Sequence, residues 1–355
     1  MDKVRLLFLP GVDADNTNAQ SLNVREIARR LDPERFECSL WYEREPDPRL
    51  QGASGIHLLQ LPVRGKTRRI LREMLAGYDL IGYMDFSPAS YLFLHLPRPL
   101  RRKTNAVFHA EAPAAQLGTP SWQLRMLYEG IYPRCDVYTG ITEFVASDVE
   151  RHLGKQVSHI LPVGVDTKVF TPPASRRNPV PVVLFAGTVI ERKGPQHVVE
   201  AAAHFPQVHF RIVGAGREGF EDILRRKIEC SGLKNVRLEG PKTQAEMQAI
   251  MRASDIFVLP SRLEGIPKVT LEAAATGLPC IVFRDYETPS VMDGLTGFQV
   301  EDTSTMIERL GQLIRDPGLR ESMGAAARKH VERFDWDTVS RLWQNAYLEM
   351  VGRQE

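Results

Sequence analysis

The sequence has few of the features that mark secreted, zinc-binding or membrane-spanning proteins. Its 355 residues include only four cysteines, Cys38, Cys135, Cys230 and Cys280, which are scattered and form no C-x-x-C pair. Neither a zinc site nor a disulfide framework is therefore expected, and a reducing, cytoplasmic environment is favoured. The N-terminal run VRLLFLPG is too short for a signal peptide or a membrane span, and it is typical of a first buried strand.

The sequence also lacks an excess of charge of one sign, low-complexity tracts and short-period repeats. Lysine and arginine number 46 against 44 aspartates and glutamates, giving a net charge of +2, so no nucleic-acid partner is expected. Hydrophobic residues make up 43% of the chain, as in ordinary globular proteins. Because single cores stop growing near ~250–300 residues, the length predicts two domains.

Short apolar segments alternate with helical patterns along most of the chain. We expect strands such as FECSLWY (36–42), VVLFAGT (182–188) and CIVF (280–283), each joined to the next by a helix. This alternation predicts an α/β protein with doubly wound parallel sheets. A proline-rich segment at 162–181 indicates a linker, so we expect domains at 1–165 and 166–335, with a C-terminal helix at 336–355 that packs back on the first.

The stretch SRLEGIPKVTLEAAATGLP (261–279) places two glutamates eight residues apart. Pro267 is suited to a helix start, and Gly277 with Pro279 to its end, so a helix is expected from about Pro267 to Thr276. A helix N-terminus attracts anions, and carboxylates accept hydrogen bonds from hydroxyl pairs. A ligand with a diphosphate between two polyols would fit, although two unrelated surface glutamates would give the same pattern.

Two glycine-containing loops follow predicted strands. GAGREG (Gly214–Gly219), with Glu239 at the end of the next strand, is close to the dinucleotide-binding fingerprint. It does not lie in the first strand–helix unit of its domain, so a tight structural turn is the favoured interpretation. GTVIERKG (Gly187–Gly194) carries Arg192 and Lys193, which are suited to neutralising a diphosphate.

Three further features have weaker signals. Asp13-Ala14-Asp15 and Asp335-Trp336-Asp337 spell D-x-D, but we expect no metal at either. His109 follows the strand residues NAVF and is a candidate site residue. Basic residues dominate 64–75 and 98–103, so peripheral contact with an anionic membrane is a hypothesis, beside the simpler one of a solvated surface. These are Arg64, Lys66, Arg68, Arg69, Arg72, Arg98, Arg101, Arg102 and Lys103.

In their order, several segments together resemble the family-4 retaining glycosyltransferases of the GT-B fold. They are LPVGVDTKVF, FAGTVIERKG, RIVGAGRE, NVRLEG, DIFVLPS, SRLEGIPKVTLEAAATGLPCIV with the family's E-x7-E spacing, and DGLTGFQV. The resemblance is strongest from Leu161 to Val300. It implies two Rossmann-like domains facing a central cleft, the second binding a nucleotide-diphosphate sugar.

The resemblance also implies roles for individual residues. Glu264 would bind the donor sugar, Glu272 the nucleotide ribose, and Lys193 the phosphates, while His109 would lie near the reacting centre. The remaining donor-binding candidates are Gly187, Arg192, Gly216, Gly265, Ile266, Pro267, Lys268, Asn18 and Ala19.

Three positions depart from the family pattern. Thr188 stands where the phosphate loop usually has an arginine, which Arg192 would have to replace. Asn18 and Ala19 stand where the family has a glycine pair, and Ser290 stands where a glutamate is common.

The resemblance implies a metal-independent hexosyltransferase that uses a UDP- or GDP-sugar, needs no cofactor and acts on a sugar, lipid-linked or small-molecule hydroxyl. Two alternatives remain open from the residues: an NAD(P)-dependent oxidoreductase using Gly214–Gly219, and a non-catalytic nucleotide-sugar binder.

Overall fold

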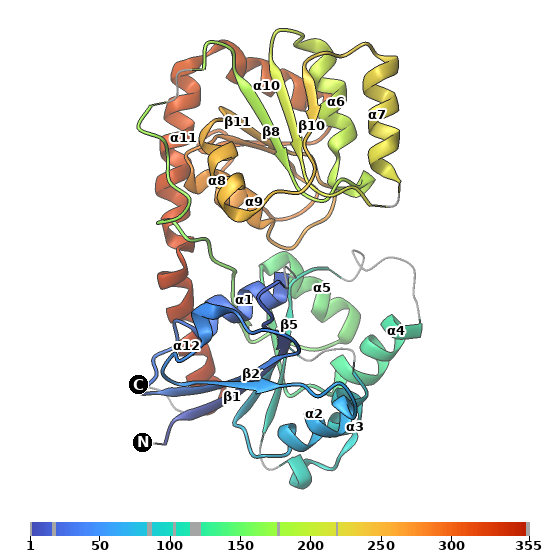
Figure 1. Ribbon diagram of the computed structural model, residues 1–355, viewed down its shortest axis with the longest axis vertical. Helices are drawn as coiled ribbons and strands as arrows, with labels where there is room; N and C mark the ends of the chain where they lie inside the picture. Colours follow the sequence, from blue (N-terminus) through green and yellow to red (C-terminus); the bar gives the residue numbers. More distant parts are fainter. Residues whose placement is uncertain are drawn as a thin grey trace. The chain divides into compact units, whose positions relative to one another are not determined.

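The computed structural model describes residues 2–15, 19–83, 87–101, 104–113, 122–175, 178–217 and 219–352. The chain divides into two compact units, each with its own parallel sheet (Figure 1). Unit 1 comprises Met1–Val163 and Trp336–Glu355, and unit 2 comprises Gly164–Asp335. Within the described residues, no helix has both the length and the hydrophobicity needed to cross a bilayer.

The sheet of unit 1 has the strand order β3-β2-β1-β4-β5-β6-β7, and every pairing is parallel. Most residues of the central strands are buried, which explains why the sequence of these segments is almost continuously apolar. The strands are β1 (Val4–Gly11), β2 (Phe36–Tyr42), β3 (Ile56–Gln60), β4 (Leu80–Gly82), β5 (Asn105–Ala110), β6 (Val137–Gly140) and β7 (His159–Ile160).

Helices connect these strands, and local signals set some of their ends. In α5 the Thr142 side chain accepts the N–H of Val145, and Gly154 ends the helix with a φ of 62°. The α-helices are α1 (Ala19–Ala28), α2 (Lys66–Met74), α3 (Pro88–His95), α4 (Trp122–Arg125), α5 (Glu143–Leu153) and α12 (Trp336–Met350). Shorter turns are η1 (Pro48–Leu50), η2 (Arg98–Arg101), the π-helical η4 (Met126–Ile131) and η5 (Tyr132–Arg134).

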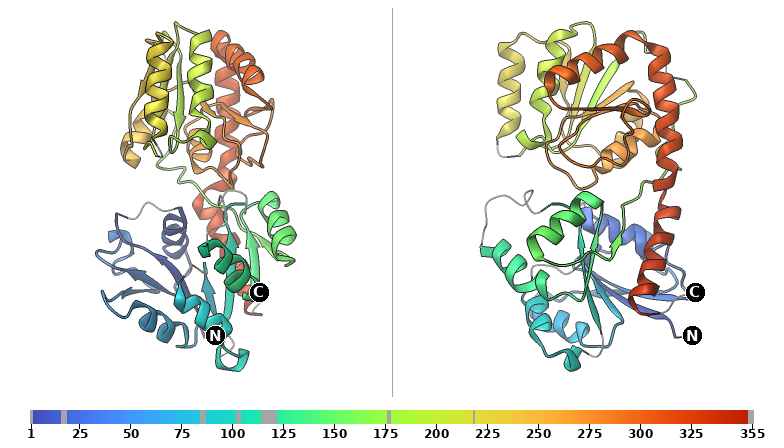
Figure 2. Two further views of the ribbon diagram at one scale, coloured as in Figure 1. Left: turned by 90° about the vertical axis from the view of Figure 1, so that its right-hand side faces the viewer. Right: turned by 180° about the vertical axis from the view of Figure 1, so that it is seen from behind.

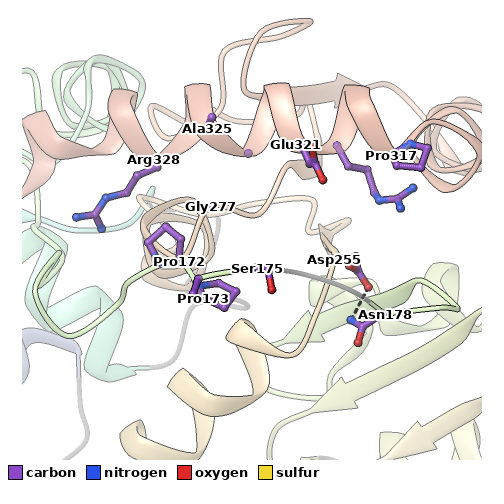
Figure 3. A pocket seen from close by; sticks show the side chains of 13 residues that line it. Pro172, Pro173, Ser175, Asn178, Asp255, Gly277, Pro317, Glu321, Ala325 and Arg328 are labelled. Atoms are coloured by element: carbon purple, nitrogen blue, oxygen red, sulfur yellow. Dashed lines mark hydrogen bonds between the residues drawn. The ribbon is translucent and has the colours of Figure 1, made fainter.

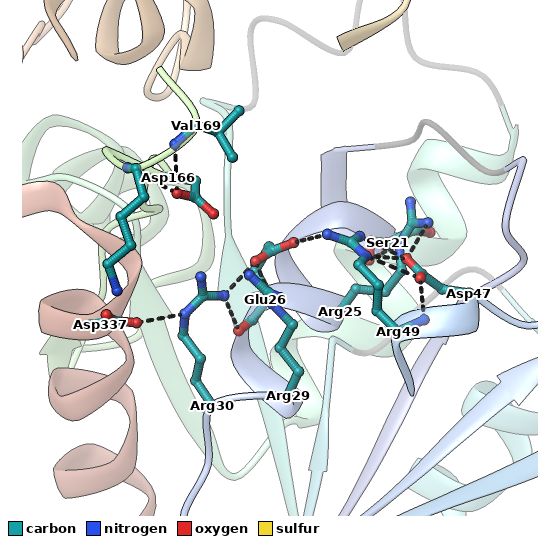
Figure 4. Close-up of polar contacts among 11 residues, drawn as sticks. Ser21, Arg25, Glu26, Arg29, Arg30, Asp47, Arg49, Asp166, Val169 and Asp337 are labelled. Carbon is teal, nitrogen blue, oxygen red and sulfur yellow. Dashed lines mark hydrogen bonds and ion pairs between the residues drawn. The ribbon is translucent and has the colours of Figure 1, made fainter. Parts of the chain in front are cut away.

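The last helix, α12, completes the core of unit 1. Trp343 and Tyr347 are buried, and the indole N–H of Trp343 donates to the carbonyl of Pro162 at 3.1 Å. The ion pair between Arg30 and Asp337, at 3.0 Å, joins α12 to the end of α1 (Figure 4). Residues from the two ends of the chain therefore share one core.

Charged side chains of α1 bind the loop that contains η1. Arg25 and Asp47 form a buried ion pair at 3.1 Å, and Arg49 contacts Asp47 at 2.7 Å and Glu26 at 2.9 Å (Figure 4). Glu26 also pairs with Arg30. This network fixes α1, which follows the carboxyl end of β1, against the neighbouring loop.

The sheet of unit 2 has the order β10-β9-β8-β11-β12-β13 and is also parallel throughout. β11 and β12 are buried along their whole length. The strands are β8 (Val182–Ala186), β9 (His209–Val213), β10 (Val236–Leu238), β11 (Ile256–Leu259), β12 (Cys280–Phe283) and β13 (Gly297–Val300).

Helices cover both faces of this second sheet (Figures 1 and 2). α6 packs against α7 and α10, while α9 packs against α11. The helices are α6 (Pro195–His204), α7 (Phe220–Cys230), α8 (Gln244–Arg252), α9 (Lys268–Ala275), α10 (Thr303–Arg315) and α11 (Pro317–Val331), with short turns η6 (Glu191–Lys193) and η7 (Glu332–Phe334).

Both sheets share one topology. In each sheet, the second and third strands lie outward from the first strand on one side and the later strands lie on its other side, the order of the doubly wound fold. The predicted fold class is confirmed. The order reverses between β1 and β4 and between β8 and β11, which are the positions where open α/β sheets bind ligands.

Some elements were absent from the sequence prediction. α3, α11 and β13 carry weak local signals: α11 contains two glycines, and β13 spans only four residues. The proline-rich segment predicted as a linker is ordered in part, since the Val165 N–H donates to the Phe334 carbonyl at 2.9 Å.

Glycine is required where the loop after β8 meets the loop after β11. Gly194 has a φ of 78°, and a Cβ there would lie 2.1 Å from the carbonyl oxygen of Pro260. Neither the left-handed backbone nor the space admits a side chain. Gly194 therefore allows the backbone beside Lys193 to approach the end of β11.

We expect Gly194→Ala to destabilise the protein by ~3 kcal/mol or more, because it adds a steric clash to the cost of a left-handed alanine. Gly232→Ala is a matched control, since Gly232 has a φ of 64° but nothing within 4 Å of its Cβ position. That variant should lose only ~1 kcal/mol. Urea unfolding of the two variants measures the difference, and equal losses would show that the contact with Pro260 is unimportant.

Candidate active site

The loops that follow β8 and β11 place three charged residues in contact. Lys193 Nζ lies 2.6 Å from Glu264 Oε1, and Arg192 approaches the same oxygen at 3.2 Å. The Ser261 hydroxyl donates to it at 2.5 Å. Glu264 and Ser261 are buried, whereas both cations are partly exposed. One carboxylate therefore faces two cations at the rim of the sheet, leaving a local positive charge.

Backbone hydrogen bonds hold these two loops together. The carbonyl of Arg192 accepts the N–H of Arg262 at 3.1 Å, and the Arg192 guanidinium donates to the carbonyl of Leu263. Gly187 lies at the start of the first loop, where its N–H donates to the carbonyl of Val213 at 3.0 Å. The predicted phosphate loop is thus fixed between the ends of β9 and β11.

The second glycine loop, GAGREG, lies beside the first. Val189 and Gly216 form a parallel β-bridge, and the N–H of Val189 donates to the carbonyl of Ala215 at 2.9 Å. A Cβ at Gly214 would lie 1.8 Å from the carbonyl oxygen of Gly187. Gly214 therefore serves close backbone packing between the ends of β8 and β9.

Residues 265–267 link β11 to α9 and are buried. Pro267 is the N-cap of α9, and no side chain caps the helix there. The first turn contains no acidic residue, and Lys268 is its first member. This uncapped helix end and its lysine extend the positive potential of Arg192 and Lys193.

Glu272 lies in the second turn of the same helix and is partly exposed. Burial raises the pKa of its carboxyl from 4.5 to about 7, and the charge of Lys268 opposes this shift. Without a ligand, Glu272 is thus close to half-protonated at neutral pH.

A buried tyrosine next to Glu264 was not anticipated from the sequence. The Tyr286 hydroxyl is buried, and the Thr288 hydroxyl lies beside it. Burial raises its pKa, with a further contribution from the charge of Glu264. Tyr286 belongs to no local motif, so only the three-dimensional arrangement identifies it, while Ser261 begins the motif at 261–279 without having been singled out.

His109 lies in β5 of unit 1 and is buried. Its ring packs edge-on against Trp343, with centroids 4.7 Å apart, and Nδ1 lies 2.8 Å from the hydroxyl of Thr139. The Thr139 hydroxyl also lies 3.4 Å from the carbonyl of Phe108, and if it donates there, Nδ1 carries the proton and Nε2 is an acceptor. Burial lowers the pKa of His109 to about 3, and Nε2 has no partner among the described residues. A neutral imidazole of this kind can accept a hydrogen bond from a hydroxyl.

Other buried polar groups gather near His109 at the carboxyl ends of β4 and β5. Asn23 of α1 donates from Nδ2 to Glu111, while its Oδ1 is buried and has no partner in the described residues. Tyr83 has a left-handed φ of 58°, and the Glu111 charge adds to burial in raising its pKa. Tyr83 also contacts His109, with ring centroids 5.3 Å apart. No local sequence pattern indicated these residues.

Asn18 and Ala19 were predicted to contact the donor from the loop after β1, and the structure describes only one of them. Ala19 is the first residue of α1, in unit 1, and Asn18 lies outside the described residues.

The two D-x-D sequences have structural roles. Asp13 accepts the backbone N–H groups of Glu43 and Arg44, and Asp335 accepts from the hydroxyl of Thr167 at 2.5 Å. Across the described ranges, no group of three histidine, cysteine or carboxylate side chains has the arrangement of a metal site.

Glu239, the acidic residue that a dinucleotide site would need, is already paired. Arg211 binds its two carboxylate oxygens at 2.6 and 2.8 Å and lowers its pKa. The pair lies across neighbouring strands, which is a structural role for the GAGREG strand and the strand that follows.

Unit 2 also contains a hollow of about 780 Å³ beside α11 (Figure 3). Asp255 in its wall accepts from Asn178 at 2.8 Å, and Gly277 lines the opposite side. Asp255 immediately precedes β11, so this hollow is at the amino ends of the strands. Lys193 and Glu264 are at the carboxyl ends, so the hollow is separate from the candidate active site.

Together, the fold and these charged loops define a protein of the GT-B glycosyltransferase class. Residues 21–169 match the family model Glycosyltransferase Family 4, and residues 170–330 match Glycosyl transferases group 1. The two matches are consecutive, and the chain belongs to the family-4 glycosyltransferases. The resemblance seen in the sequence is confirmed.

Curated relatives match part of the chain. A GDP-mannose-dependent monoacylated alpha-(1-6)-phosphatidylinositol monomannoside mannosyltransferase of Corynebacterium glutamicum is 32% identical over 59% of this chain and 61% of its own. A D-inositol 3-phosphate glycosyltransferase of Xylanimonas cellulosilytica is 29% identical over 64% of this chain and 60% of its own. The chain thus spans about three fifths of the length of these relatives.

Solved structures share the fold over almost the whole chain. HepE of Anabaena, in complex with UDP and glucose, has a TM-score of 0.77 at 17% identity and covers 95% of this chain and 97% of its own. Sucrose-phosphate synthase of Thermosynechococcus elongatus has a TM-score of 0.77 at 18% identity, covering 99% and 100%. These likenesses show the fold alone.

The raised pKa of Glu272 predicts how its replacement changes stability with pH. Folding favours the protonated carboxyl, so this stabilisation is present below pH 4.5 and is lost as the pH rises toward 7. Glu272→Gln should match the wild type near pH 4.5 and exceed it above pH 7, by up to about 3 kcal/mol. Urea unfolding at several pH values tests this. A stability difference between the two proteins that does not change with pH would contradict it.

Proposed function

We propose that this protein transfers a hexose from a nucleotide-diphosphate sugar to a hydroxyl acceptor, with retention of anomeric configuration and without a metal ion. The convergence of Lys193 and Arg192 on Glu264 at the strand-order reversal of unit 2 carries the proposal. Family membership supports it, as do the GDP-mannose named for one relative and the UDP bound to HepE.

The roles of the residues follow from charge. When the C1–oxygen bond of the donor breaks, the electron pair leaves with the diphosphate, which then gains negative charge. Lys193, Arg192 and the uncapped N-terminus of α9 stabilise that charge where a metal ion does so in other transferases. When the donor binds, Lys193 and Arg192 pair with its phosphates instead of with Glu264. The carboxylate of Glu264 is then free to accept hydrogen bonds from hydroxyls of the sugar.

The other donor contacts are assigned to α9 and the loops around it. The carboxylate of Glu272 accepts the two ribose hydroxyls, and the backbone of Gly265, Ile266, Pro267 and Lys268 faces the sugar and phosphates. Gly187 and Gly216 allow the two glycine loops to approach the nucleotide. No side chain is assigned as a covalent nucleophile, so the acceptor hydroxyl attacks on the face that the diphosphate leaves and gives its proton to the departing phosphate oxygen.

The acceptor is assigned to unit 1. His109 Nε2 and Asn23 Oδ1 are acceptor atoms without partners in the described residues, and Glu111 adds a carboxylate beside them. Such a group is suited to a polyol or sugar hydroxyl. The names of the relatives, which specify inositol phosphate and a phosphatidylinositol mannoside, favour an acceptor that is a polyol, free or attached to a lipid. Action in the cytoplasm, at the surface of a membrane, is part of this proposal.

Removing the site charges should abolish transfer while preserving the fold. Lys193→Ala and Glu264→Ala are each expected to lose at least ~100-fold in kcat, because charge stabilisation of the leaving group is lost in one and sugar positioning in the other. Lys329→Ala, an exposed lysine on α11, is the control. Wild-type turnover by either variant would remove that residue from the mechanism.

Ligand binding can be tested without knowing the acceptor. A thermal-shift panel of UDP, GDP, ADP, dTDP and NAD, each with and without EDTA, should show one nucleoside diphosphate raising the melting temperature by several degrees, unaffected by EDTA. The same shift should shrink in Lys193→Ala. A shift with NAD alone would favour the oxidoreductase. Binding of a nucleoside diphosphate without hydrolysis or transfer of the matching sugar would indicate a non-catalytic binder.

A further inference from the structure

Large apolar side chains are exposed on several neighbouring elements of unit 1. They lie on consecutive elements that contact one another: α2 packs against α3, α3 against η4, and η4 against α4. Figures 1 and 2 show α2, α3 and α4 along the same side of the unit. The exposed residues are Val63 before α2, Tyr91 and Leu92 on α3, Leu100 on η2 and Trp122 on α4. We call them and the arginines described next the α2–α4 surface.

Unpaired cations lie beside these apolar residues. Arg64, Arg68 and Arg72 are exposed, and none of them forms an ion pair with any described residue. Arg68 and Arg72 are one helical turn apart on α2, so they repel each other unless an anionic surface covers them. The other described cations of segments 64–75 and 98–103 form ion pairs. Lys66 pairs with Glu43, Arg69 with Glu73, and Arg98 and Arg101 with Asp136. Arg102 and Lys103 lie outside the described residues.

The exposed fractions are large for residues of these types. Trp122 is 67% exposed, Leu100 58% and Leu92 47%. Contiguous exposed apolar groups mark interaction surfaces in soluble proteins. Tryptophan and tyrosine favour the boundary between lipid headgroups and acyl chains, while arginine can extend its charge toward the headgroups.

We propose that the α2–α4 surface binds an anionic lipid bilayer, with Leu92, Leu100 and Trp122 entering the headgroup region and Arg64, Arg68 and Arg72 contacting the lipid charges. Charge complementarity selects this occupant, because three unpaired cations accompany the apolar residues on the same elements. Two acids lie on these elements, Glu73 and Glu129, and each is within an ion pair with a neighbouring arginine. The proposal does not depend on the transfer reaction, so its test requires neither donor nor acceptor.

Trp122 is a built-in reporter of this contact. The other three tryptophans, Trp41, Trp336 and Trp343, are all buried. Acrylamide therefore quenches Trp122 preferentially, and a change in its quenching reports on the α2–α4 surface directly.

The experiment uses the full chain with vesicles of phosphatidylcholine alone or with about one third phosphatidylglycerol, at low salt. Co-sedimentation with the anionic vesicles, a blue shift of the fluorescence and protection of Trp122 from acrylamide are expected, all weakening as salt is added. Arg68→Gln with Arg72→Gln should weaken binding by about thirty-fold, since each basic residue near an anionic surface contributes a factor of about five. Leu92→Ser with Leu100→Ser should weaken binding and reduce the blue shift.

The matched control is Lys234→Gln with Arg237→Gln, two exposed cations of unit 2 that change the net charge equally. It should bind as the wild type does. Circular dichroism checks that every variant is folded. Failure to bind anionic vesicles overturns the proposal, as does equal weakening by the control. If Trp122 stays fully quenched on vesicles, another surface binds them, and protection that rises with protein concentration alone would instead identify a second copy of the chain as the occupant.

Discussion

The reversal of strand order between β8 and β11 is the constraint on which the candidate site depends. Crossovers between parallel strands are right-handed, so the connections that start from these two neighbouring strands leave toward opposite faces of the sheet. The loops at their carboxyl ends therefore meet without a helix between them. One loop supplies Arg192 and Lys193, and the other supplies Glu264 and the start of α9. Unit 1 repeats this arrangement between β1 and β4, where Asn23, Tyr83 and Glu111 gather.

In the absence of ligand, Glu264 offsets only part of the charge of Arg192 and Lys193, so the unit 2 site keeps a net positive charge. Three donors converge on a single oxygen of Glu264, which is buried and so could not remain ionised at low cost without them. An arriving diphosphate offers the two cations a more highly charged partner. The resting ion pairs thus keep the cations near the position where they are needed, which reduces the reorganisation that binding requires.

Much of the fold was predictable because it is encoded locally. Buried parallel strands appear in the sequence as apolar runs, and β2 and β12 have the predicted bounds. Arg192, Lys193 and Glu264 were predictable because a family pattern fixes their order, and the structure adds that they touch. Tyr286, Asn23 and Glu111 were not, because their importance arises from contact with residues distant in sequence. The raised pKa of Glu272 likewise depends on what surrounds α9 rather than on its sequence.

The contribution of α12 to unit 1 has a consequence for biosynthesis. Trp343 and Tyr347 emerge from the ribosome after all of unit 2, although they fill the core around β1. Unit 2 is continuous in sequence and can fold as soon as it is synthesised, whereas the first unit to be translated must wait for the last helix. During that interval the apolar surface that α12 covers is exposed to solvent. The N-terminal half of the chain is thus the last part of the protein to reach its native state.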